Sequence, residues 1–347
     1  MDLPKADLLI STPRIEVLHQ PGEGDQLLLM FGGLGSRANG VTFVGHRLAT
    51  KLNMPAIGFM PKHGNWYPKE DIELIRPSIE PLLSKYKTRL AYGFSMGGYG
   101  AIKHSRALGA THVLAMSPQW SIDPEVAPWE RRYLHFIDKC SENMEIVDDD
   151  CGGEIYVIFD NMNKDRFHAE KISSAAAVNS IQAPLTGHDT WKLFLSSATM
   201  RALFDAVFNG DKLRMFQIVR ERRRLLPDIQ TRVLWARALK HFRVKRYAEA
   251  ERVARQADAA PNRVPGAAWL LGAILLETKR PSEAEVVLRA EMRRFPSIRW
   301  LGGYLVRAIE MQGHYSEAMA VLEPQLASQP HRVDLQKAAQ RIAAKLA

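Results

Sequence analysis

The sequence predicts an α/β domain with a doubly wound, mostly parallel sheet over residues 1–210, followed by an all-α helical repeat domain over 211–347. Apolar runs of strand length alternate with helical patterns through the first part. The second part repeats with a period of 34 residues, which is typical of stacked helical hairpins. The charge changes at the same place, because residues 1–210 hold 21 Lys and Arg against 24 Asp and Glu, whereas 211–347 hold 26 against 14.

The elements of the first part follow from periodicity. The predicted strands are Ile15–Leu18, Gln26–Phe31, Met54–Met60, Thr88–Phe94, Thr111–Met116, Ile155–Asp160 and Val178–Ala183. The predicted helices are Val41–Leu52, Lys69–Tyr86, Met96–Leu108, Ala127–Cys140, Asp165–Ser174 and Trp191–Phe208. Several strands are apolar throughout, as in a parallel sheet covered by helices on both faces.

Composition limits the class of protein. With 347 residues, the chain is long for one domain, and 46% apolar with 24% charged residues is ordinary for a globular protein. No stretch approaches the roughly 18 apolar residues of a membrane span, and the amino terminus lacks a signal-peptide core, so we expect a cytoplasmic protein. The two cysteines, Cys140 and Cys151, indicate neither a disulfide framework nor a metal site, and no cofactor is expected.

A candidate nucleophile lies at the end of the fourth predicted strand. Residues 93–98 read G-F-S-M-G-G, which places Ser95 between a strand and a helix. Glycines two residues before and after the serine permit a tight turn that exposes its hydroxyl above the sheet. The pattern therefore predicts nucleophilic catalysis by Ser95.

The other parts of such a site occur in the appropriate order. The glycine-rich turn after Gln26–Phe31 contains Gly33 and Leu34, whose backbone N–H groups, with that of Met96, are the predicted oxyanion hole. His188, in the loop before the last helix, is the predicted base.

Two aspartates compete for the role of orienting acid. Asp160 closes a strand and is followed by a loop, so it is preferred. Asp165 stands ahead of a helical pattern, where its carboxylate is expected to cap the helix. The preference predicts that Asp160→Asn lowers activity much more than Asp165→Asn.

Residues 1–210 resemble the α/β-hydrolase superfamily, because the G-F-S-M-G-G elbow, the glycine turn, a late aspartate and a final-loop histidine follow the family order. The resemblance implies acyl chemistry through an acyl-enzyme on Ser95. The loop residue His63 and the aromatic residue Trp120 are candidate substrate contacts. Residues 117–153 could form a flap over Ser95, although the aromatics Trp129, Tyr133 and Phe136 are more typical of a packed face.

The second part resembles tetratricopeptide repeats (TPR). Glu249, Glu283 and Glu317 are 34 residues apart, and each is followed by an alanine. Prolines at 296 and 330 end successive repeats. Residues 200–227 are expected to form a degenerate first repeat, and residues 332–346 a capping helix.

The start of this part is strongly basic. The residues concerned are Arg222, Arg223, Arg224, Arg232, Arg237, Lys240, Arg243, Lys245 and Arg246. Such a surface either binds an acidic partner, as a protein-binding repeat stack would, or is simply solvated. No recognition motif accompanies the charge, so nucleic acid is not the expected partner, while a homo-oligomer stays open.

The leading hypothesis is thus a serine hydrolase that cleaves an ester or thioester, with repeats that bind a partner or form an oligomer. Two alternatives stay open. One is a catalytically silent hydrolase fold that serves as a scaffold, and the other is an acyltransferase that uses the same three residues.

Overall fold

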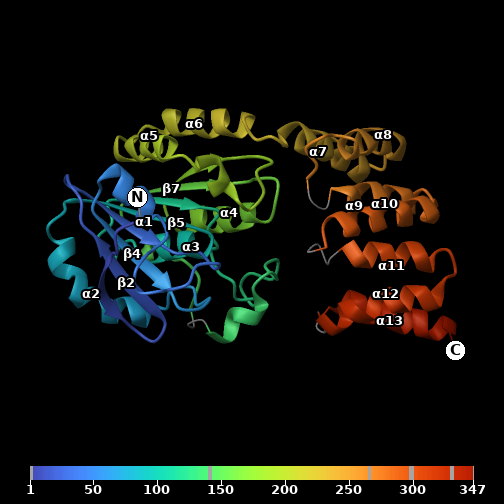
Figure 1. The fold of residues 1–347 in the computed structure, drawn as a ribbon, viewed down its shortest axis with the longest axis horizontal. Coiled ribbons are helices and arrows are strands. Elements are labelled where there is room, and N and C mark those ends of the chain that lie inside the picture. Colours follow the sequence, from blue (N-terminus) through green and yellow to red (C-terminus); the bar gives the residue numbers. More distant parts are fainter. Residues whose placement is uncertain (1–2, 140–142, 265–266, 297–300, 329–331, 347) are drawn as a thin grey trace. The chain divides into compact units, whose positions relative to one another are not determined.

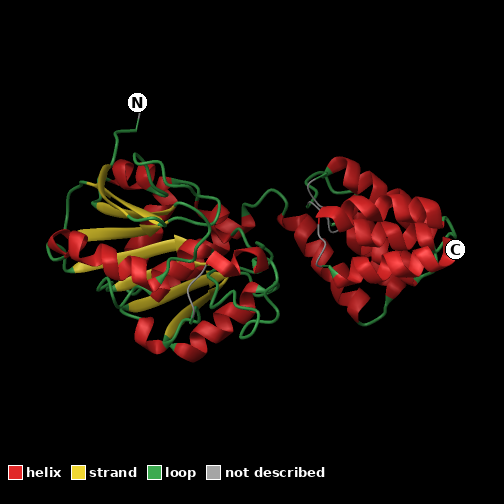
Figure 2. Cartoon of the chain, turned by 90° about the horizontal axis from the view of Figure 1, so that it is seen from below, coloured by secondary structure: helices red, strands yellow, loops and turns green. Residues whose placement is uncertain are grey.

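The computed structural model describes residues 3–139, 143–264, 267–296, 301–328 and 332–346. Two compact units make up the chain, Met1–Leu225 and Leu226–Ala347. The first is a mixed α/β unit and the second contains helices only (Figures 1 and 2). Within the described residues, the helices are all too short or too polar to cross a membrane.

Eight strands form one sheet in the first unit. They are β1 (Asp7–Ser11), β2 (Ile15–Gln20), β3 (Gln26–Phe31), β4 (Ala56–Pro61), β5 (Thr88–Phe94), β6 (His112–Met116), β7 (Glu154–Phe159) and β8 (Val178–Gln182). Their order across the sheet is β1-β2-β4-β3-β5-β6-β7-β8. β1 and β2 run antiparallel to their neighbours, while β4, β3 and β5 to β8 are mutually parallel.

The parallel strands end along a common edge, and this edge positions the site. The paired residues there are Phe31 with Gly93, Phe94 with Met116, Met116 with Ile158, and Phe159 with Gln182. The segments that follow β3, β5, β6, β7 and β8 therefore begin side by side, although they are far apart in the sequence.

Helices cover both faces of the sheet. They are α1 (His46–Leu52), α2 (Lys69–Leu83), α3 (Met96–Lys103), α4 (Asp165–Ala175) and α5 (Ser197–Phe208). The apolar residues of α2, α3 and α4 share one core with alternate residues of the strands. On the other face α5 packs on β5 and β6, where Phe204 meets Tyr92 at 5.7 Å and Phe208 meets His112 at 5.6 Å between ring centroids. The alternation of buried side chains along each strand produces these two cores.

Two predicted features of this unit need correction. The first strand, Asp7–Ser11, was not expected; it is an exposed edge strand, although Leu8, Leu9 and Ile10 are apolar. The helix predicted over 127–140 does not form within the described residues, where a 3₁₀ helix covers Leu134–Lys139. Cys140 lies outside the described residues. In this irregular connection the aromatic side chains of Tyr133 and Phe136 pack against Trp66.

The boundary between the units follows residue 225 rather than 210. Helix α6 (Lys212–Arg224) packs on β8 and the 3₁₀ helix Thr190–Phe194. Its basic end is fixed to the first unit, because Arg222 donates to the carbonyl of Leu193 and Arg223 to that of Pro184. This helix therefore belongs to the α/β unit and not to the degenerate repeat expected over 200–227.

The second unit is built from helical hairpins. Its helices are α7 (Ile229–Arg243), α8 (Tyr247–Asp258), α9 (Ala268–Glu277), α10 (Pro281–Arg294), α11 (Gly302–Glu310), α12 (Tyr315–Ser328) and α13 (Val333–Leu346). Figure 1 shows them in successive layers. The repeated alanines Ala250, Ala284 and Ala318 are fully buried, because small side chains let paired helices approach closely. Proline 330 lies outside the described residues.

Candidate active site

Ser95 lies on a sharp turn between β5 and α3. Its backbone has φ 54° and ψ −121°, which is a strained conformation for a residue with a side chain. The Ser95 N–H donates to the carbonyl of Met116 at 2.8 Å, so the turn is tied to the neighbouring strand β6. The side chain is 4% exposed. The strand-turn-helix context predicted for the G-F-S-M-G-G segment is present.

The glycines of this turn are required by close backbone contacts. A Cβ on Gly93 would lie 2.1 Å from the carbonyl oxygen of Gly97, and a Cβ on Gly97 would lie 2.3 Å from that of Phe31. Both obstacles are backbone atoms, which cannot rotate away. The turn can therefore bring Ser95 between two strands only with glycine at both positions.

Gly93→Ala is expected to lower the free energy of unfolding by about 3 kcal/mol or more, since overpacking against backbone forces the turn to move. Gly35→Ala is the matched control, because its Cβ would have no atom within 4 Å; its effect should stay within about 0.5 kcal/mol. Urea denaturation of both variants measures this. Equal effects would show that the turn tolerates a methyl group.

His188 connects Ser95 to a carboxylate. Its Nε2 lies 2.9 Å from Ser95 Oγ, and its Nδ1 lies 2.8 Å from Asp165 Oδ2. An ionised carboxylate only accepts, so the Nδ1–H donates to Asp165 and Nε2 is left as the acceptor of a neutral imidazole. This is the tautomer that can receive a proton from the serine hydroxyl.

The carboxylate that meets His188 in the structure belongs to Asp165 and not to the preferred Asp160. Asp160 instead accepts three backbone N–H groups, from Met162 at 2.8 Å, Leu185 at 3.0 Å and Gly187 at 2.7 Å. It therefore holds the loop that carries His188. Asp165 does not cap α4, because it is the first helical residue and its carboxylate bonds His188 and Arg132 instead.

Asp165 belongs to a buried charged network. Burial opposes its ionisation, but the hydrogen bond from His188 and the charge of Arg132 outweigh burial, so the pKa of Asp165 lies below its ordinary value. Arg132 donates to Asp165 Oδ1 at 3.1 Å and pairs with Glu130 at 2.5 Å. Glu130 in turn accepts from the fully buried His168 at 2.9 Å. This network holds the Asp165 carboxylate ionised and fixed in orientation.

The predicted oxyanion donors are placed around Ser95. Met96 is the first residue of α3, and Gly33 and Leu34 line the same cavity as Ser95. Their role as donors stays a prediction, since it depends on where a bound acyl oxygen lies.

A cavity of about 440 Å³ opens at Ser95. Its lining is mainly apolar, which suits a small ligand with an acyl chain. The residues are Phe31, Gly33, Leu34, Gly35, Ser36, Val44, Tyr92, Phe94, Ser95, Tyr133, His188 and Trp191.

The two predicted substrate contacts are not part of this lining. The His63 ring is bound locally, with Nδ1 3.4 Å from the carbonyl oxygen of Gly64. Trp120 donates from its ring to the carbonyl of Ile146 at 2.9 Å, so it fastens the connection after β6. Both predictions relied on a loop position alone, which does not give the direction of a side chain.

Two polar residues beside Ser95 were not predicted as functional. Gln119 donates to Ser95 Oγ at 3.2 Å, and the hydroxyl of Tyr133 lies 3.5 Å from His188 Nε2. Burial raises the pKa of Tyr133, although Arg132 opposes this, so the hydroxyl stays protonated. Gln119 could have been found, because it is a polar residue in the loop that follows β6, the strand beside the serine strand.

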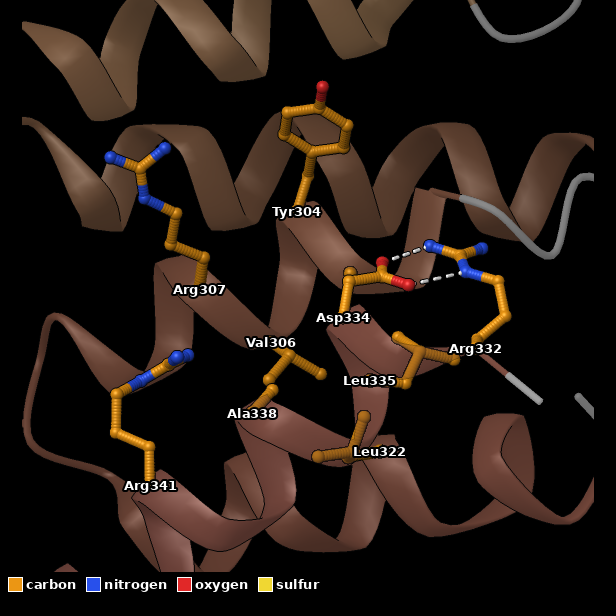
Figure 3. A pocket seen from close by; sticks show the side chains of 10 residues that line it. Tyr304, Val306, Arg307, Leu322, Arg332, Asp334, Leu335, Ala338 and Arg341 are labelled. Atoms are coloured by element: carbon orange, nitrogen blue, oxygen red, sulfur yellow. Dashed lines mark hydrogen bonds and ion pairs between the residues drawn. The ribbon is translucent and has the colours of Figure 1, made fainter. Parts of the chain in front are cut away.

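The repeat unit has a cavity of its own, about 310 Å³ in volume. Figure 3 shows Arg307, Arg332 and Arg341 around it, with Arg332 paired to Asp334. Arg307 also pairs with Glu277 at 3.2 Å and Arg341 with Glu310 at 2.6 Å, so these arginines bridge helices within the unit. An acidic or protein partner of this unit stays a prediction.

The chain matches no protein-family model, and no curated protein gives a significant match. Among solved structures it is similar to the capsule O-acetyltransferase of Neisseria meningitidis serogroup A (13% identity, TM-score 0.40, covering 57% of this chain and 92% of that one). It is also similar to the Pyrococcus horikoshii acylaminoacyl peptidase (12% identity, TM-score 0.44, covering 59% of this chain and 41% of that one). A third similar structure is the first TPR domain of the human RPAP3 protein (18% identity, TM-score 0.33, covering 34% of this chain and 94% of that one). These partial likenesses carry no functional conclusion.

Proposed function

We propose that the α/β unit is a serine hydrolase that cleaves an ester or thioester through an acyl-enzyme on Ser95, with His188 as base and Asp165 as its orienting acid. The observation that carries the proposal is the continuous chain of hydrogen bonds from Ser95 Oγ to His188 at 2.9 Å and on to Asp165 at 2.8 Å. A serine hydroxyl is a weak nucleophile until a base within this distance can take its proton.

The proposed reaction has two steps. Ser95 Oγ attacks the acyl carbon while its proton moves to His188 Nε2, and the leaving group departs with that proton. Water then attacks the acyl-enzyme, with His188 again as base. Transfer to an alcohol or amine in place of water uses the same first step, so analysis of the products separates hydrolysis from acyl transfer.

Labelling with a fluorophosphonate probe tests the proposal. We expect the purified full chain to be labelled on one residue, Ser95, as read by mass spectrometry of its peptides. Denatured protein, in which the serine has no base, is the control. A folded chain that stays unlabelled and hydrolyses no p-nitrophenyl ester would leave a silent scaffold as the better description.

The cavity at Ser95 predicts a preference among acyl chains. Val44 lies on its lining, so Val44→Phe should fill part of it. We expect kcat/KM for p-nitrophenyl octanoate to fall about tenfold, since the exclusion of a few methylene groups has an effect of this size, while p-nitrophenyl acetate changes little. Val286→Phe, at an exposed position in the repeat unit, is the control. An equal change in kcat/KM for both esters would show that the acyl chain of the ester does not bind in this cavity.

A further inference from the structure

Gln119 is a buried polar residue that the proposed triad does not use. It lies just after β6, and its side chain is 0% exposed. Its Nε2 is 3.2 Å from Ser95 Oγ, the atom that attacks the substrate in the proposed function. Burying a side-chain amide costs free energy unless its polar groups form hydrogen bonds, and one of the groups that bonds Gln119 is the nucleophile itself.

The orientation of the Gln119 amide follows from its other neighbour. The indole Nε1 of Trp66 lies 3.2 Å from Gln119 Oε1, and an indole N–H can only donate. The amide oxygen must therefore face Trp66. The NH₂ group is left facing Ser95, which makes Gln119 a donor to the serine.

This direction fixes the serine hydroxyl. Because Gln119 Nε2 cannot accept, the Ser95 hydroxyl cannot direct its proton there. His188 Nε2, at 2.9 Å, accepts it and is the atom that must receive the proton in catalysis, while the Tyr133 hydroxyl, which also bonds Ser95, can donate to Oγ. Gln119 thus donates to Oγ while the hydroxyl proton is directed to His188.

We propose that Gln119 is a catalytic residue that aligns the Ser95 hydroxyl and stabilises the negative charge on Oγ as its proton leaves. The inference rests on the proposed function. The Oγ–H bond breaks and its proton passes to His188 Nε2, while the Oγ electron pair forms the bond to the acyl carbon. The carbonyl π pair moves to its oxygen. Gln119 keeps its own protons and lowers the barrier through its N–H dipole.

Two substitutions of similar size test this. Gln119→Met removes the donor, and the rate of fluorophosphonate labelling and kcat are expected to fall about 10- to 100-fold, at or below the effect of losing one oxyanion-hole donor. Gln119→Glu should be worse at neutral pH, because an ionised carboxylate accepts the Ser95 proton in competition with His188. KM should change little, whereas the melting temperature of Gln119→Met should fall by a few degrees, because the buried Trp66 indole N–H loses its acceptor.

Gln20→Met is the matched control. Gln20 is also a buried glutamine, but it pairs with Ala56 at the opposite edge of the sheet, so its loss should not change labelling. If Gln119→Met does not fold, Trp66→Phe replaces it. This change removes the indole N–H that orients the amide together with part of a buried ring, so we expect it to slow labelling several-fold and to lower the melting temperature.

The outcomes separate the two proposals. A wild type that is not labelled overturns the proposed function itself. A labelled wild type with Gln119→Met equally fast overturns the role of Gln119 alone. If Gln119→Glu is labelled faster than Gln119→Met, the donor direction is wrong. The expected order, from fastest to slowest, is wild type, Gln119→Met and Gln119→Glu.

Discussion

Replacing Ser95 with alanine is expected to lower kcat for ester cleavage by on the order of 10⁵- to 10⁶-fold, the loss typical when one member of a serine triad is removed. The substitution removes the only atom that can form the acyl-enzyme in the proposed reaction. His188→Ala should lose nearly as much, because the hydroxyl then has no base at 2.9 Å. Steady-state kinetics with p-nitrophenyl acetate measures both.

The double variant sharpens this prediction. If Ser95 and His188 act as one unit, Ser95→Ala combined with His188→Ala should be no slower than either single variant. Ser95 is nearly buried and alanine is smaller, so each protein should keep its melting temperature within a few degrees. Independent, additive losses would contradict a triad.

Asp165→Asn is expected to lower kcat by about 10⁴-fold, as the loss of the correct imidazole tautomer does in serine proteases. Arg132 can only donate, so the amide oxygen of the new asparagine will face Arg132. Its NH₂ group then faces His188 Nδ1 and forces that nitrogen to accept. The ring proton moves to Nε2, where it blocks transfer from Ser95.

Asp160→Asn is the matched comparison, because both aspartates are buried at the same edge of the sheet. The new side chain can accept through only one oxygen, so a backbone N–H of the His188 loop loses its partner. We expect a loss of stability of about 1–3 kcal/mol and a fall in kcat of about tenfold or less. Urea denaturation and kinetics measure the two effects. A larger loss of kcat for Asp160→Asn would reverse the assignment.

The lowered pKa of Asp165 also predicts how the hydrogen-bonded pair of Asp165 and His188 responds to acid. A carboxyl group whose folded-state pKa is depressed stabilises the fold above its unfolded pKa, and that contribution disappears as pH falls through the folded pKa. Asp165 should therefore still be ionised at pH values where an ordinary aspartate becomes protonated. Activity lost on mild acidification should come from groups other than Asp165.

Local patterns in the sequence determined much of this protein. The strands β3 to β7 were predicted from apolar runs of the kind that buried parallel strands have, and the elbow at Ser95 because only glycine fits beside backbone at Gly93 and Gly97. The repeat helices were predicted because a fixed period of 34 residues requires no knowledge of distant contacts. These features depend on residues close together in the chain.

The choice between Asp160 and Asp165 was decided only by tertiary structure. Both aspartates follow β7 within a few residues, and which carboxylate meets His188 depends on the course of a loop after β8 and on Arg132 from an irregular segment. Gln119 likewise acquires a direction only through Trp66, 53 residues away. The direction of a side chain at a site depends on partners distant in the sequence. A local sequence pattern therefore predicts which residues are candidates, and tertiary packing determines which of them come into contact.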